Sequence, residues 1–349
     1  MVLILRGINL RFSKSVRDIS VRVATLALKV KPVFRIIDEL AVKLRRYSYR
    51  DPRIAKFRLR LVKLIDLSDD FNGFYGPSYF GFGRTTGDRE GISGYDSLTI
   101  DTSKSDLSAA LIDYLFAPDS VLEVGCAEGH LVSALLKLDI DARGFDYSRF
   151  AVRHSLDEVS DRITWGDLLS GLRVESKSVD VVVALETLEH LPPERIHLAV
   201  EELIRISRGF IYLTMPSFGA NDVGLDGWFE GKVRDERLDY YKSLGDQYQG
   251  PVPTVDLALD KNGKLVEGHT AIASFSWWRD QFLAAGCTRD IDLERHLYVK
   301  LEEFNMTPYW NAYLFRVPNC DISPKRELAD EEIFDKSRNL FNLDRYLGQ

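Results

Sequence analysis

The chain has 349 residues, of which 45% are hydrophobic and 28% charged, so it is long enough for one large α/β domain with additions or for two domains. Its three cysteines (Cys126, Cys287 and Cys320) lie far apart without CxxC spacing, which argues against a disulfide framework or a zinc–thiolate site. No apolar run approaches the ~20 residues that span a bilayer, and the opening MVLIL is too short for a signal-peptide core. We therefore expect a cytoplasmic protein.

The charge is distributed unevenly along the chain. Residues 1–63 hold 17 Lys and Arg against 4 Asp and Glu, a net of +13. Because the whole chain carries −7, residues 64–349 carry −20. This split suggests a basic arm attached to an acidic body.

Residues 1–70 are predicted to form a basic helical extension, because apolar residues recur at helical spacing over 14–30, 33–46 and 51–65. These helices either pack on the main domain or bind an anionic membrane surface or a membrane-bound partner through residues 1–65. The second use would place the protein peripherally at the inner face of the membrane. The acidic body and the lack of interleaved aromatic residues disfavour nucleic acid.

The next segment, 71–103, is rich in glycine and aromatic residues, with six aromatics between Phe71 and Phe82. Long loops in compact domains are usually functional or disordered. Its aromatic content makes a lid that closes over a ligand more plausible than a disordered segment.

The stretch 120–130, SVLEVGCAEGH, reads as a short buried strand, a turn of small residues and the start of an amphipathic helix. An apolar strand that ends in a glycine turn opening a helix is typical of a nucleotide-like ligand site. Glycine lets the backbone approach the ligand, and the helix start supplies free N–H groups. Glu123 within the strand would repel phosphate, so it suits a ligand with a cationic centre.

From 104 onward the pattern alternates between helices and strands, which predicts a parallel sheet covered on both faces. A helix at 104–116 precedes strands at 121–124, 142–145, 163–165, 179–185 and 210–214. The second strand ends in Asp146, 23 residues after Glu123, and the third is followed by Asp167. An acidic residue at the end of the second strand can accept both ribose hydroxyls of a nucleoside. The three acidic positions agree with a single ligand.

The glycine turn resembles motif I of the class I S-adenosylmethionine (SAM)-dependent methyltransferases, an Asp or Glu followed by Gly-x-Gly-x-Gly, with Ala127 in place of the middle glycine. The resemblance implies a Rossmann-like fold, with seven mostly parallel strands and helices on both faces. It further implies SAM as cofactor. The cofactor-binding residues would be Glu123, Gly125, Ala127, Gly129, Asp146, Tyr147, Asp167, Leu168 and Glu186. Tyr79, Arg84 and Tyr95 of the lid would be additional contacts.

The fourth strand runs directly into Glu186-Thr-Leu-Glu189-His190, where polar residues face the ligand crevice of such sheets. Methyl transfer to a hydroxyl requires an in-line approach and removal of a proton. His190 is the first candidate base, with Glu189 beside it and His269 as the second.

Glu186, Glu189 and His190 also have the donor types of an Mg²⁺ or Mn²⁺ site that acidifies an acceptor hydroxyl. This arrangement is similar to that of ubiquinone-biosynthesis O-methyltransferases and of small-RNA 2′-O-methyltransferases. The latter add a distant histidine, a place that His269 can take.

After the fifth strand, an insertion at 218–268 carries aromatic residues and is expected to select the substrate above the crevice. The methyltransferase domain, 104–320, is predicted to close with antiparallel strands at about 288–293 and 310–317. The tail, 321–349, has apolar anchors compatible with a docking helix at 329–340.

The basic arm, the aromatic insertion and the His-then-Ser-Trp-Trp helix resemble bacterial methyltransferases that act on surface polysaccharides and glycolipids. We therefore expect O-methylation of a sugar hydroxyl in a glycan or glycolipid. The alternatives are a quinone or small-molecule phenol and an RNA 2′-hydroxyl, the latter disfavoured by the acidic body. A catalytically silent scaffold subunit is the alternative of another class, against which Glu186, Glu189 and His190 argue. The oligomeric state is not predicted.

Overall fold

In the computed structural model the described residues are 36–41, 43–44, 57, 61, 103–218, 240–241, 243–244, 248, 250–257, 268–304, 311–320, 322 and 331–347. The chain divides into two compact units, one of residues 1–88 with 93–100 and one of residues 89–92 with 101–349. In the first unit, residues 36–41, 43–44, 57 and 61 are helical, within two of the predicted helices. The predicted helix at 14–30 and the lid residues Tyr79, Arg84 and Tyr95 lie outside the described residues.

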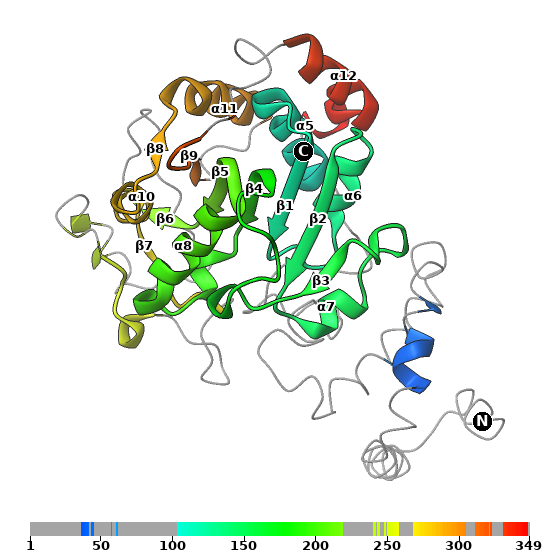
Figure 1. Cartoon of the computed structure of the whole chain (residues 1–349), viewed down its shortest axis with the longest axis horizontal. Coiled ribbons are helices and arrows are strands. Elements are labelled where there is room, and N and C mark those ends of the chain that lie inside the picture. Colours follow the sequence, from blue (N-terminus) through cyan, green and yellow to red (C-terminus); the bar gives the residue numbers. More distant parts are fainter. Residues whose placement is uncertain are drawn as a thin grey trace, which may run out of the picture. The chain divides into compact units, whose positions relative to one another are not determined.

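The second unit is built on a seven-stranded sheet, which confirms the predicted α/β fold (Figure 1). The strand order is β3-β2-β1-β4-β5-β9-β8, and β9 and β8 are the antiparallel members. The strands are β1 (Ser120–Val124), β2 (Asp141–Asp146), β3 (Ile163–Trp165), β4 (Val179–Leu185), β5 (Ser207–Met215), β8 (Thr288–Arg289) and β9 (Asn311–Arg316). Two short strands, β6 (Ser217–Phe218) and β7 (Ala273–Ser274), pair separately at the two ends of the insertion.

Helices cover both faces of the sheet. They are α5 (Ser103–Phe116), α6 (His130–Leu136), α7 (Arg149–Arg153), α8 (Ile196–Ile206), α10 (Phe275–Ala284), α11 (Ile291–Glu303) and α12 (Glu331–Phe341). One core joins α5, α6, α11 and α12 to the sheet face of Val121, Val183 and Tyr212. The other joins α8 and α10 to the face of Leu122, Val182 and Leu213. The near-continuous apolar runs of the central strands follow from this burial on both sides.

The prediction of a strand over 288–293 was wrong beyond its second residue. The strand β8 ends at Arg289, and Asp290 caps α11 by accepting a hydrogen bond from the Leu293 N–H at 3.1 Å. Leu293, Leu297 and Leu301 are spaced by four residues and are all buried. This helical spacing outweighed the short apolar pattern at the start of the segment.

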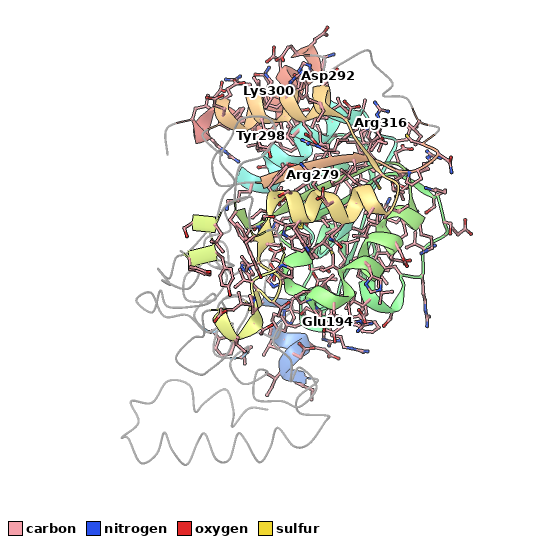
Figure 2. All side chains as sticks on the ribbon, turned by 90° about the vertical axis from the view of Figure 1, so that its left-hand side faces the viewer. Glu194, Arg279, Asp292, Tyr298, Lys300 and Arg316 are labelled. Carbon is pink, nitrogen blue, oxygen red and sulfur yellow. The ribbon has the colours of Figure 1, made fainter. Side chains whose placement is uncertain are left out.

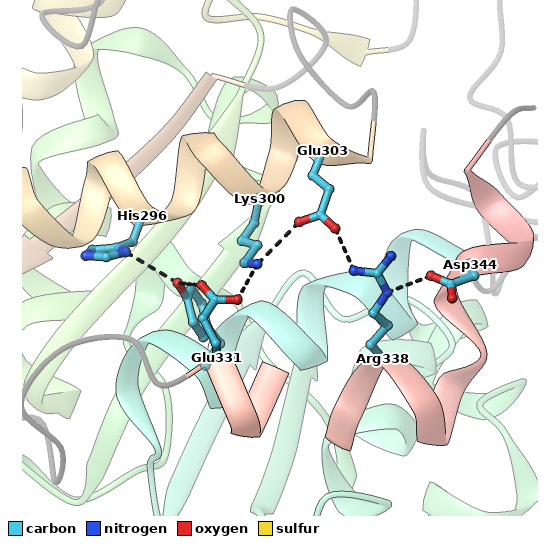
Figure 3. A network of polar contacts seen from close by, with 7 residues as sticks. His296, Lys300, Glu303, Glu331, Arg338 and Asp344 are labelled. Atoms are coloured by element: carbon cyan, nitrogen blue, oxygen red, sulfur yellow. Dashed lines mark hydrogen bonds and ion pairs between the residues drawn. The ribbon is translucent and has the colours of Figure 1, made fainter. Parts of the chain in front are cut away.

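The C-terminal helix α12 overlaps the predicted docking helix at 329–340 and is joined to α11 by charged groups (Figure 3). Lys300 donates to Glu331 at 2.7 Å and to Glu303 at 3.3 Å, and its ammonium lies 4.4 Å from the Phe334 ring centroid. Arg338 bonds both Glu303 and Asp344 at 2.6 Å. In Figure 2, Lys300 and Tyr298 of α11 lie at the opposite end of the view from Glu194, which follows β4. The charged contacts are therefore remote from the carboxyl ends of the strands.

Candidate functional site

The glycine turn after β1 is closed by backbone bonds to the neighbouring strand. The N–H groups of Gly125 and Cys126 both donate to the Phe145 carbonyl, at 2.8 and 3.2 Å. Gly125 and Gly129 have φ values of +77° and +86°. Ala127 has a φ of +48°, so it takes the left-handed conformation that the missing glycine of the motif would supply, at a cost of about 1–2 kcal/mol. The motif is thus preserved in its backbone shape.

Thr187, at the end of β4, packs directly over Gly125. Its hydroxyl donates to the Leu185 and Val124 carbonyls at 3.1 and 3.2 Å, which joins the β4 end to the β1 end. A Cβ at Gly125 would lie 2.2 Å from the Thr187 Oγ1. Sequence reasoning missed Thr187, because nothing in its local pattern signals a contact that is 62 residues away.

Two buried carboxyls flank the turn. Asp146 accepts the Ala127 N–H at 2.7 Å and the Ser148 N–H at 2.6 Å, one on each carboxylate oxygen. Burial raises the pKa of Asp146 to about 6, although both N–H groups oppose the rise. Burial, and then the charge of Asp146, raise the pKa of Glu123 to about 8. Because both carboxyls are buried and close together, a positively charged ligand at this site would favour their ionised forms.

The remaining predicted cofactor residues lie at neighbouring strand ends. Tyr147 follows Asp146 and is 58% exposed, so its ring can contact a ligand. Asp167 caps the short 3-10 helix Leu168–Ser170 by accepting the Leu169 N–H at 3.0 Å and the Ser170 hydroxyl at 2.6 Å. Glu186 has a φ of +51°, and its N–H donates to the Thr214 carbonyl at 2.9 Å. A non-glycine residue in this conformation often marks a functional site.

A second cluster forms where the chain returns from the insertion. The N–H groups of Thr270 and Ala271 both donate to the Glu189 carbonyl, at 2.8 and 2.9 Å, and the Thr270 hydroxyl donates to the Leu191 carbonyl at 2.7 Å. These bonds bring His269 beside Glu189 and His190, although 79 residues separate the two histidines. The Nε2 atoms of both histidines lie 3.9 Å from the same Glu189 oxygen, Oε1.

The His190 ring is oriented by a backbone carbonyl. Its Nδ1 lies 3.3 Å from the Gly268 carbonyl oxygen, which can accept a hydrogen bond from a protonated Nδ1. Burial lowers the pKa of His190 to about 4, so the ring is neutral at neutral pH. The carboxylate and both imidazoles offer ligand atoms within 4.8 Å of one another. Within the described residues, the group that could hold a cation thus contains His269, whereas the sequence analysis expected Glu186 with Glu189 and His190.

A cavity of about 1340 Å³ lies on the sheet face of Leu122, Arg143 and Phe145 and reaches Trp165 at the end of β3 and Asp167 after it. It contains neither the glycine turn nor the three residues of the second cluster. Its volume alone therefore does not make it the reaction site.

Among the described residues, no helix is both long and apolar enough to cross a membrane. Of the insertion, the aromatic residues Tyr241 and Tyr248 pack with Phe218, Val252 and Ile272, while Trp228 and Phe229 lie outside the described residues.

Comparison with known proteins finds a methyltransferase domain. A methyltransferase domain family matches residues 99–254. A ubiquinone biosynthesis O-methyltransferase of Cupriavidus pinatubonensis is 35% identical over 96 residues, which is 26% of this chain and 38% of that protein. The match thus spans well under half of the curated relative's length.

Solved structures also resemble the chain. A putative methyltransferase in complex with the Haloferax volcanii Trm112 activator is 19% identical over 54% of this chain and 70% of its own, with a TM-score of 0.35. A putative SAM-dependent methyltransferase of Methanococcus maripaludis is 23% identical over 31% of this chain and 54% of its own, with a TM-score of 0.28.

The packing at Gly125 generates a prediction. The Gly125→Ala variant combines a φ of +77° with a Cβ 2.2 Å from Thr187 Oγ1, so we expect it to lose about 2–4 kcal/mol of stability and its affinity for S-adenosylhomocysteine. Gly125→Ala/Thr187→Ala should recover part of the stability. Gly250→Ala, where nothing lies within 4 Å, is the control. Urea unfolding and calorimetry measure both effects, and an unchanged Gly125→Ala variant would contradict the packing.

The strand order, the glycine turn with its two buried carboxyls, and the match of residues 99–254 to a methyltransferase domain family together support a class I SAM-dependent methyltransferase domain.

Proposed function

We propose that the chain transfers the methyl group of SAM to a hydroxyl oxygen. The observation that carries the proposal is the placement of two clusters at the carboxyl ends of adjacent strands. The turn after β1 has paired buried carboxyls, and the segment after β4 holds Glu189 and His190 beside His269. Parallel α/β sheets bind ligands at this edge.

The described residues fit SAM. The ammonium and sulfonium of the cofactor would offset the cost of ionising Glu123, which burial otherwise keeps protonated. Each oxygen of Asp146 accepts one N–H and retains a lone pair, so the two oxygens can receive the two ribose hydroxyls. The exposed ring of Tyr147 can pack on the adenine, with Asp167 and Leu168 completing that side. When bound, SAM would supply an electrophilic methyl group, and the electron pair of the broken C–S bond would stay on the sulfur.

The Glu189–His190–His269 cluster is proposed to accept the proton of the hydroxyl. In this proposal the Gly268 carbonyl accepts a hydrogen bond from a protonated Nδ1 of His190, and Nε2 is the atom that takes up the proton. The Glu189 carboxylate, 3.9 Å from both imidazoles, would stabilise the imidazolium that forms. His269 is the second proton acceptor.

A specific observation favours a second candidate mechanism, in which this cluster holds Mg²⁺ or Mn²⁺. Two imidazoles and a carboxyl group offer ligand atoms within 4.8 Å of one another, and His190 bonds a carbonyl through its Nδ1, as metal-ligating histidines do through the nitrogen that does not bind the metal. A bound cation would acidify the acceptor hydroxyl.

We further propose a sugar hydroxyl of a glycan or glycolipid as the acceptor. Tyr240, Tyr241 and Tyr248 give the described part of the insertion a cluster of aromatic rings, a surface type on which sugars stack. The +13 charge of residues 1–63 supports binding of this arm at an anionic membrane face where lipid-linked glycans reside. The name of the curated relative makes an intermediate of ubiquinone biosynthesis the competing acceptor.

The raised pKa values predict a pH dependence of cofactor binding. At pH 7 the Glu123 carboxyl, with a pKa of about 8, is mostly protonated, and SAM favours its ionised form. SAM binding should therefore release a proton at pH 7, and affinity should rise by up to about tenfold per pH unit as pH increases towards 8. Because the folded pKa exceeds the ordinary value of 4.5, the unliganded fold loses stability over the same rise.

Calorimetry in buffers of different ionisation enthalpy measures the released proton. Glu123→Gln should abolish it and flatten the dependence above pH 7. A buffer-independent binding heat in the unmodified chain would contradict the assignment of Glu123.

A screen with labelled SAM against glycan, ubiquinone-precursor and RNA acceptors tests the proposed reaction. With the acceptor that it identifies, Glu189→Gln and His190→Ala should each lower kcat by about 10²-fold or more while leaving SAM affinity within twofold. Glu194→Gln, an exposed residue of the same segment, should change neither. Equal activity of all variants would contradict a role for the cluster.

Metal analysis of the full chain separates the two mechanisms. One equivalent of Mn²⁺ bound in the unmodified chain but not in Glu189→Ala would support the metal mechanism. Activity that survives EDTA, with no metal bound, would support the histidine base.

A further inference from the structure

The peptide bond between Tyr147 and Ser148 is held at both of its polar ends. On one side the Trp165 indole N–H donates to the Tyr147 carbonyl at 2.8 Å. On the other side the Ser148 N–H donates to the Asp146 Oδ1 at 2.6 Å. Because a peptide unit is planar and rigid, the carbonyl and the N–H cannot turn independently. The indole therefore fixes the direction in which the N–H meets the carboxylate.

The sheet places Trp165 where it can do this. Asp146 and Trp165 are register partners on the parallel strands β2 and β3, so their side chains leave the same face side by side. β3 is the outermost strand of the sheet. The Arg149 guanidinium lies 4.4 Å from the indole centroid and covers the ring. Trp165 remains 41% exposed, so it is not a core residue held for packing alone.

We propose that Trp165 is a positioning residue for the carboxylate of Asp146: through the Tyr147–Ser148 peptide it directs the Ser148 N–H onto Oδ1, which keeps the carboxylate ionised and aimed at the nucleoside diol. This inference rests on the proposed binding of SAM at Asp146. It adds a residue that touches neither the cofactor nor the reacting atoms.

The charged and titratable groups around Asp146 influence whether its carboxyl is ionised. Glu123 of β1 and the Cys126 thiol of the glycine turn both interact electrostatically with Asp146. From α7, the Arg149 side chain is engaged over the Trp165 ring. The N–H groups of Ser148 and Ala127 are the hydrogen bonds that lower the pKa of Asp146. Weakening one of them shifts the carboxyl towards its protonated form, which cannot accept both hydroxyls.

The test replaces Trp165 by phenylalanine, which keeps an aromatic ring and removes the N–H. We expect SAM to bind about fivefold more weakly at pH 6–7, the loss of one net hydrogen bond, and with near-normal affinity at pH 9, where Asp146 is ionised in any case. The pH midpoint of the lower limb of binding should move upward from the value near 6 that Asp146 sets. KM for SAM should rise, and kcat at saturating SAM should stay within twofold.

Hydrogen exchange of the Ser148 amide gives a readout that needs no ligand. Its exchange in the unliganded Trp165→Phe chain should be about tenfold faster. Benzothienylalanine at position 165, which keeps the shape of the bicyclic ring and lacks only the N–H, should reproduce both effects if the phenylalanine variant folds poorly. Trp277→Phe in α10 is the matched control and should alter neither.

The outcomes separate this inference from the proposed function. If Asp146→Asn binds SAM as the unmodified chain does, the proposed cofactor site is wrong. If Asp146→Asn weakens binding while Trp165→Phe leaves the pH profile and the Ser148 exchange unchanged, the positioning role of Trp165 alone is overturned. A uniform loss of affinity at every pH in Trp165→Phe would likewise overturn it, because that result reports only a structural defect.

Discussion

The burial of two neighbouring carboxyls beside the glycine turn is the constraint on which the candidate site depends. Burying a charge is costly unless it is paired or hydrogen-bonded. Asp146 meets this cost in part with two backbone N–H groups, whereas Glu123 remains mostly protonated at neutral pH. A positively charged ligand that also presents a diol would favour the ionised form of Glu123 and donate hydrogen bonds to Asp146. In the proposed function, the buried charges that weaken the unliganded fold therefore favour a cationic cofactor at the turn.

A second constraint is the single backbone carbonyl of Glu189, which accepts two N–H groups from the chain that returns from the insertion. The insertion is thereby anchored at its far end to the segment after β4. His269, which directly follows the insertion, is brought beside Glu189 by these bonds of the next two residues. In the proposed function, this hydrogen-bonded loop would join substrate selection by the insertion to proton removal by the Glu189–His190–His269 cluster.

The sheet and the cofactor edge could be predicted from sequence because each depends on local patterns: apolar runs of strand length, positive-φ glycines and acidic residues at strand ends. Long-range contacts could not. Thr187 over Gly125 and Trp165 on the Tyr147 carbonyl are set by strand register, which one sequence does not reveal. The helix α11 was missed because its first residues also fit a strand. His269 was identified as a candidate, but its place beside Glu189 came only from the return of the insertion.

A crystal structure of the full chain with S-adenosylhomocysteine would test the central claim most directly. The account predicts the ribose hydroxyls within hydrogen-bond distance of both Asp146 oxygens, the amino group near Glu123 and the adenine against Tyr147. Density for the ligand elsewhere, for example in the cavity lined by Leu122, Arg143 and Phe145, with an empty glycine turn, would contradict it.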